Sequence, residues 1–156
     1  MMNKVMTVLI LLFALNCKTT TANQPKMGEE DIVLIAKGSL FGSGEEGIKE
    51  QNSVIINEDD WQDIMVKMNS VNKVSDSFSE SDIDFSKYTV IAVFDKVKTT
   101  GGHSLKLDIT PSSKNIEVNI IRKSPSGMAT SVMTQPYYIV KITKSDLPII
   151  FSTHKN

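Results

Sequence analysis

The sequence contains few of the residues on which metal-binding, disulfide-bonded and nucleic-acid-binding proteins depend. Among its 156 residues there are one cysteine (Cys17), one arginine (Arg122) and two histidines (His103 and His154). A lone cysteine cannot form an intrachain disulfide, and two histidines without regular spacing match no zinc pattern. With one arginine and a net charge of −1, the chain has no basic cluster for a phosphate backbone. We therefore expect no metal site, no cofactor and no nucleic-acid partner.

Long apolar runs are also missing, apart from one near the N-terminus. Val5–Leu15 is an eleven-residue run interrupted only by Thr7, whereas a bilayer-spanning helix needs about 20 apolar residues. The run fits the apolar region of a secretory signal peptide preceded by Lys4, and Cys17 follows it. This arrangement resembles a bacterial lipoprotein signal, although Asn16 is larger than the residue usually found before the lipidated cysteine. An ordinary signal peptide with an incidental cysteine is the alternative.

The chain is accordingly expected to have three parts. Residues 1–16 are the predicted lipoprotein signal peptide, and residues 17–30 comprise the lipidated Cys17 and a polar, flexible tether that includes Pro25. Residues 31–152 are long enough for one domain with one core. The expected location is the bacterial cell envelope, lipid-anchored. Lys18 after the cysteine, in place of an aspartate, favours the outer membrane.

One helix is clearly indicated over residues 57–69. Asn57 is a good N-cap, and three acidic residues, Glu58, Asp59 and Asp60, suit the positive end of the helix dipole. Its apolar residues fall at helical spacing and form one face, which we assign to the core: Trp61, Ile64, Met65 and Met68. Residues 71–88 are mostly polar and are expected to form a long connection.

Short runs rich in β-branched residues predict strands elsewhere, separated by glycine-rich or polar turns. They are residues 31–37, 53–57, 88–97, 104–110, 115–123, 136–142 and 148–151. The stretches "KTTGGHS" (98–104) and "TPSSKN" (110–115) are hairpin-length, so three consecutive antiparallel strands are predicted. The expected fold class is α+β: an antiparallel sheet with one amphipathic helix packed on it. Closure into a sandwich or a half-barrel is left open.

The stretch "KTTGGHS" also carries the most enzyme-like residues of the chain. A serine nucleophile needs its oxygen within hydrogen-bond reach of an imidazole. His103 and Ser104 are adjacent, and adjacent side chains on a strand point to opposite faces, so they cannot form that pair. Gly101 and Gly102 instead supply the backbone freedom of a tight turn. We therefore favour a turn over a catalytic loop.

Two adjacent tyrosines, Tyr137 and Tyr138, lie in the predicted penultimate strand. One ring should face the core and the other should face out, where it could serve recognition. A structural role is favoured for the pair.

Several later segments together resemble one family. They are Asp84-Phe85 before the central strand, Ala92-Val93-Phe94 within it, Thr100-Gly101-Gly102, Ser124-Pro125 with Gly127, and Thr134 with Pro136-Tyr137. Their order and spacing resemble the C-terminal domain of the PrcB family, protease-complex subunits among bacterial lipoproteins, over about residues 38–151. The "DDWQDIM" helix with Trp61 also fits. His103 stands where the family most often has tyrosine, and Thr99 where a proline is common.

The resemblance implies a domain that is not an enzyme and that binds or stabilises an extracytoplasmic protease. We therefore expect a lipid-anchored envelope domain that contacts a protein partner through loops. The candidate interaction surface consists of Thr100, Gly101, Gly102, His103, Ser124, Pro125, Gly127, Tyr137 and Tyr138. Two alternatives remain: a lipoprotein that binds a small molecule or glycan, and an envelope hydrolase that uses His103 as a base.

Overall fold

The structure, a computed structural model, describes Gly28 and residues 31–154. The predicted signal peptide, Cys17 and the tether lie outside these residues, except for Gly28. The strands are β1 (Ile32–Leu40), β2 (Gln51–Ile55), β3 (Tyr88–Phe94), β4 (Ser104–Pro111), β5 (Ile116–Lys123), β6 (Gln135–Thr143) and β7 (Ile149–His154). The helices are α1 (Glu58–Met68) and a short 3-10 helix, η2 (Val74–Ser77).

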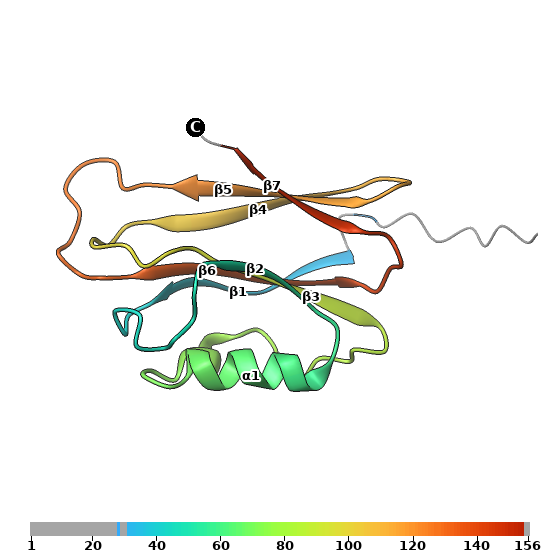
Figure 1. Ribbon diagram of the computed structural model, residues 1–156, viewed down its shortest axis with the longest axis horizontal. Coiled ribbons are helices and arrows are strands. Elements are labelled where there is room, and N and C mark those ends of the chain that lie inside the picture. Colours follow the sequence, from blue (N-terminus) through green and yellow to red (C-terminus); the bar gives the residue numbers. More distant parts are fainter. Residues whose placement is uncertain (1–27, 29–30, 155–156) are drawn as a thin grey trace, which may run out of the picture.

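These elements form three layers (Figure 1): α1, a four-stranded sheet and a three-stranded sheet. The first sheet has the order β1-β6-β3-β2 and is antiparallel throughout. The second has the order β4-β5-β7, in which β4 and β5 are antiparallel and β5 and β7 are parallel. The predicted α+β class is confirmed, and the two sheets form a sandwich with the helix on its outer face.

The central strand β3 is apolar at every position after Thr89 because both of its faces are covered. Val90, Ala92 and Phe94 belong to the core beneath α1. Ile91 and Val93 belong to the second core, between the two sheets. Alternate side chains of a strand point to opposite faces, so a strand between two cores has no position left for a solvated polar side chain. β6 follows the same rule from Tyr137 to Val140, whereas the Lys141 side chain is partly exposed and paired with Glu80.

Helix α1 begins and packs as its sequence predicts. The Asn57 side chain accepts a hydrogen bond of 2.9 Å from the backbone N–H of Asp60, which satisfies one free donor of the first turn. The four predicted core residues, from Trp61 to Met68, are all buried. The indole N–H of Trp61 donates to the Ser81 carbonyl at 2.8 Å and attaches the following connection to the helix. That connection is irregular, as predicted, apart from η2.

The predicted hairpin between residues 88–97 and 104–110 is wrong. β3 lies in the first sheet and β4 in the second, so residues 95–103 cross from one sheet to the other. The other predicted hairpin is confirmed, since Pro111 of β4 pairs with Ile116 of β5. The parallel pairing of β5 with β7 was not predicted.

Two strands are longer than expected. β1 continues to Leu40 through residues assigned to a loop, because its last residues pair with the start of β6. β7 extends to His154, three residues beyond the predicted strand 148–151, because His154 pairs with Ile121. Among the described residues, no helix is both long and apolar enough to cross a membrane.

Candidate functional site

Two loops meet at one end of the sandwich and bring most of the predicted interaction residues together. They are residues 95–103, between β3 and β4, and residues 124–134, between β5 and β6; we call them the paired loops. The backbone N–H of Lys98 donates to the Thr134 carbonyl at 2.7 Å, and that of Thr134 donates to the Lys98 carbonyl at 3.0 Å. The Thr134 hydroxyl donates to the Thr100 carbonyl at 3.1 Å. The paired loops therefore form one unit.

The double glycine allows this close approach. The backbone N–H of Gly101 donates to the Thr130 carbonyl at 3.0 Å, and a β-carbon at position 101 would collide with the Thr130 hydroxyl. Gly102 has a φ of +82°, and a β-carbon there would lie 2.9 Å from the β-carbon of Pro125. The glycines were predicted to reverse the chain within a hairpin. In the structure they let one loop pack against the other.

His103 is half-buried, and its Nε2 atom lies 3.1 Å from the Thr100 hydroxyl oxygen. Ser104 opens β4 with its side chain exposed. The hydroxyl that reaches the imidazole thus belongs to Thr100, three residues earlier, and not to the adjacent serine. This bond lies within one loop and joins Thr100 to the last residue of the loop, which is a structural function for the histidine.

A buried carboxylate fixes the base of the paired loops. The Asp95 side chain is 3 % exposed and accepts from three groups: the Lys98 ammonium at 2.8 Å, the Arg122 Nε at 3.2 Å and the Lys96 backbone N–H at 2.9 Å. Burial by itself raises the pKa of Asp95, but these hydrogen bonds outweigh it and hold the pKa below its ordinary value. Arg122 also lies 3.1 Å from Glu50, so the cluster joins both sheets.

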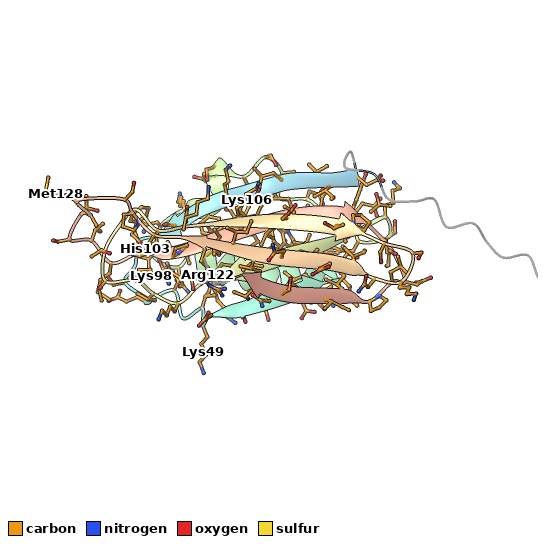
Figure 2. All side chains as sticks on the ribbon, turned by 90° about the horizontal axis from the view of Figure 1, so that it is seen from above. Lys49, Lys98, His103, Lys106, Arg122 and Met128 are labelled. Atoms are coloured by element: carbon orange, nitrogen blue, oxygen red, sulfur yellow. The ribbon has the colours of Figure 1, made fainter. Side chains whose placement is uncertain are left out.

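The outer part of the second loop is exposed and carries three large apolar side chains among serines and threonines. Residues 124–134 contain no charged residue. Met128 is fully exposed, and Val132 and Met133 are also exposed. Figure 2 shows Met128 at the outermost tip of this end, with His103 and Lys98 behind it. Large exposed apolar side chains on one loop are typical of interaction sites, and methionine adapts its shape to different partners.

The predicted site residues therefore divide into two sets. Seven of them lie in the paired loops: Thr100, Gly101, Gly102, His103, Ser124, Pro125 and Gly127. Tyr137 is 3 % exposed and packs against Phe94 with ring centroids 6.2 Å apart, so it forms no part of a contact surface. Its burial raises the pKa of its phenol. Tyr138 points to the opposite face of β6, where it packs half-buried against the core between the sheets.

Sequence reasoning missed several residues of this site. Met128, Val132 and Met133 are isolated apolar residues without periodicity, and only the exposure of their side chains identifies them. Asp95 and Arg122 are 27 positions apart, and nothing in the sequence pairs them. The structure groups no three or more histidine, cysteine, aspartate or glutamate side chains as a metal site among the residues that it describes.

Comparison with known proteins adds one match. No curated protein and no solved structure matches the chain. A family model, however, matches one segment of the chain. This segment runs from β3 to the end of β6 and includes both of the paired loops, but not α1, so it is shorter than the stretch 38–151 expected from the sequence. Residues 89–143 match the family model described as PrcB C-terminal, which confirms the predicted resemblance for this segment.

Proposed function

We propose that this chain is a non-enzymatic, lipid-anchored domain of the bacterial cell envelope that binds a protein partner, an extracytoplasmic protease, through the paired loops. The observation that carries the proposal is the exposure of three large apolar side chains, Met128, Val132 and Met133, on a loop held by a second loop. Met128 lies at the tip of this loop (Figure 2). A preformed, apolar surface of this kind loses little conformational entropy on binding. The match to the PrcB C-terminal family supports a subunit of a protease complex.

The position of the tip suits a partner away from an anchoring membrane. In the first sheet, Ile32 pairs with Ile142 and Leu40 pairs with Gln135. The loop that ends at Thr134 therefore lies at the Leu40 end of β1, and the chain enters the domain at the Ile32 end. Nine strand residues span about 26 Å at about 3.3 Å per residue. The tether from a lipidated Cys17 would join the domain at the end opposite the paired loops. The paired loops would then remain free to contact a partner.

Affinity capture from the native envelope tests this proposal. The tagged full chain is compared with a variant carrying Met128→Ser, Val132→Ser and Met133→Ser. The matched control is Ile150→Ser, which removes an exposed apolar side chain from β7. We expect the wild type and the control to recover a protease and the triple variant to lose it. Equal recovery by all three would contradict the role of the paired loops.

The two alternative functions, binding of a small molecule or glycan and hydrolysis with His103, can each be tested by a separate experiment. If capture reproducibly recovers no partner, a small molecule or a glycan becomes the favoured ligand. A thermal-shift screen against such ligands would detect it, because a bound ligand raises the unfolding temperature. A hydrolase that uses His103 remains the third function, and a substitution at that residue, described in the Discussion, separates it from the other two.

A further inference from the structure

A groove lies between α1 and the connection that follows the helix. Its volume is about 610 Å³. One wall is a stripe along the helix formed by Glu58, Gln62, Val66 and Asn69, which share a face because they are spaced by three or four residues. The opposite wall contains Ser75, Ser81 and Asp82. None of the paired-loop residues lines the groove. Helix α1, which forms one of its walls, is the outer layer of the domain in Figure 1.

The two walls of this groove are held together by hydrogen bonds. At one end, the Trp61 indole donates to the Ser81 carbonyl at 2.8 Å. At the other, the Asn69 amide donates to the Ser75 hydroxyl at 2.8 Å and accepts from the Ser75 backbone N–H at 3.0 Å. The connection cannot close over the helix without breaking these bonds. The groove is therefore present before any ligand binds, which lowers the cost of binding.

The charges of the chain are unevenly distributed. Residues 58–87 contain eight acidic and three basic residues, a net charge of −5. Residues 88–154 contain four acidic and eight basic residues, a net charge of +4. Glu80 is paired with Lys141, and Asp84 with Lys87. Glu58 and Asp82 line the groove and form no ion pair with a described residue, although the Glu58 carboxylate accepts a hydrogen bond of 2.6 Å from the Gln62 amide. The described residues that line the groove include no basic side chain.

The groove also contains an apolar contact point. Val66, in the middle of the helical stripe, is 68 % exposed, and the buried Met65 contributes to the same wall. The stripe from Glu58 to Asn69 spans about 17 Å at about 1.5 Å per helical residue. An extended peptide of about five residues has that length. Glu58 and Asp82 lie near the end of the groove that the Trp61–Ser81 bond closes, and Val66 lies further along the helix. Together they complement a peptide that carries both cationic and aliphatic side chains.

We propose that this groove binds an extended lysine- or arginine-rich segment of a partner protein, about five residues long. Cationic side chains lie beside Glu58 and Asp82, and an aliphatic side chain packs on Val66. This second binding site shares no residue with the paired loops. Its test is therefore independent of the test of the proposed function.

Two labelled pentapeptides serve as probes, one of alternating lysine and leucine and one of alternating glutamate and leucine. Binding to the full chain is measured by fluorescence anisotropy at low salt. We expect the lysine peptide to bind and the glutamate peptide not to bind. In NMR spectra, the amide shifts that change should be concentrated at Gln62, Val66, Ser75 and Ser81. Absence of binding by the lysine peptide would overturn the proposal.

Matched variants distinguish the groove from general attraction to the acidic layer. Glu58→Lys and Asp59→Lys make the same charge change one residue apart, and only Glu58 lines the groove. We expect Glu58→Lys to bind the peptide about fivefold more weakly than Asp59→Lys does, in line with the strength of exposed ion pairs. Val66→Ser should weaken binding about threefold, whereas Val71→Ser, which alters an exposed valine outside the groove, should not. Equal binding by the members of either pair would overturn the proposal.

Two further results would assign a different occupant and overturn the proposal. The first is tighter peptide binding by the full chain when Lys18→Glu and Lys26→Glu are combined, which would place the chain's own residues 18–27 in the groove. The second is self-association, measured by analytical ultracentrifugation, that is lost in Glu58→Lys but kept in Asp59→Lys. That result would make a second copy of the chain the occupant.

Discussion

Gly101 lies so close to Thr130 that the two loops could not pack as they do with any larger residue at position 101. Gly101 is not among the glycines with positive φ, so alanine there would be excluded by contact and not by backbone conformation. We predict that Gly101→Ala lowers the free energy of unfolding by about 1–3 kcal/mol, the usual cost of overpacking. Urea unfolding followed by tryptophan fluorescence measures this change.

A second substitution tests whether the Thr130 side chain is the cause. Combining Gly101→Ala with Thr130→Ala removes the hydroxyl that the new methyl group would meet, although Val132 remains 3.1 Å from the position that this methyl carbon would occupy. We expect the double variant to regain part of the lost stability. If the double variant loses the sum of the unfolding free energies that the two single substitutions lose, the contact between position 101 and Thr130 does not explain the destabilisation.

The same loop shows where sequence reasoning reaches its limit. Gly101 and Gly102 suit a tight turn and suit close loop packing equally well, because both need a missing side chain. The turn was predicted between two strands of one sheet, but the strands lie in different sheets. The residues of β3 are apolar at both alternating sets of positions, which indicates that other parts of the chain pack on both faces of this strand. Only the pairing of β6 with β3 and β1 identifies the neighbours of β3.

Helix α1 was predictable because its signals are local. Asn57 and the buried stripe from Trp61 to Met68 lie within twelve consecutive residues, and each signal has one physical cause. The interaction site depends instead on contacts between residues distant in sequence. Gly101 and Thr130 are 29 positions apart, and the exposure of Met128 follows from the path of the whole loop.

We predict that His103→Tyr leaves the domain folded and competent for partner binding. His103 contacts Thr100 within its own loop, so the substitution removes one local hydrogen bond and should change the unfolding free energy by about 1 kcal/mol or less. Affinity capture and urea unfolding measure the two properties. Loss of a hydrolytic activity of the wild-type protein in His103→Tyr, with folding retained, would support the hydrolase and contradict a binding domain.

Cys17 is the predicted anchor, and its substitution should release the protein from the membrane. Stable attachment requires more than one acyl chain, and Cys17 is the residue predicted to carry them. We predict that the wild type incorporates labelled palmitate and sediments with membranes, and that Cys17→Ser does neither. Thr19→Ser, two residues further, is the control and should behave as the wild type. Palmitate incorporation that is unchanged in Cys17→Ser would contradict this prediction and favour an ordinary signal peptide.

The ion cluster at Asp95 should contribute strongly to stability. Removing one partner from a buried ion pair costs about 3–5 kcal/mol, and Lys98 and Arg122, which are 15 % and 29 % exposed, retain some contact with water. We therefore expect Asp95→Asn to lower the free energy of unfolding by about 2–3 kcal/mol. Asp84→Asn, which breaks the solvent-exposed pair with Lys87, should move the urea midpoint far less. Equal effects of the two substitutions would contradict the role of burial.

The contribution of Asp95 should also disappear in acid. Its pKa lies below the ordinary value of 3.8 in the folded protein, so the unfolded chain takes up the proton first as the pH falls. The stabilisation is therefore fully present above about pH 4 and is lost as the pH falls through the folded pKa. Asp84, whose pKa is lowered to about 2 mainly by its hydrogen bond with Lys87, titrates alike in wild type and in Asp95→Asn. We predict that the difference in urea midpoint between these two proteins is constant from pH 7 to 5 and shrinks from pH 4 to 2. A difference that stays constant to pH 2 would mean that the carboxylate charge does not stabilise the paired loops.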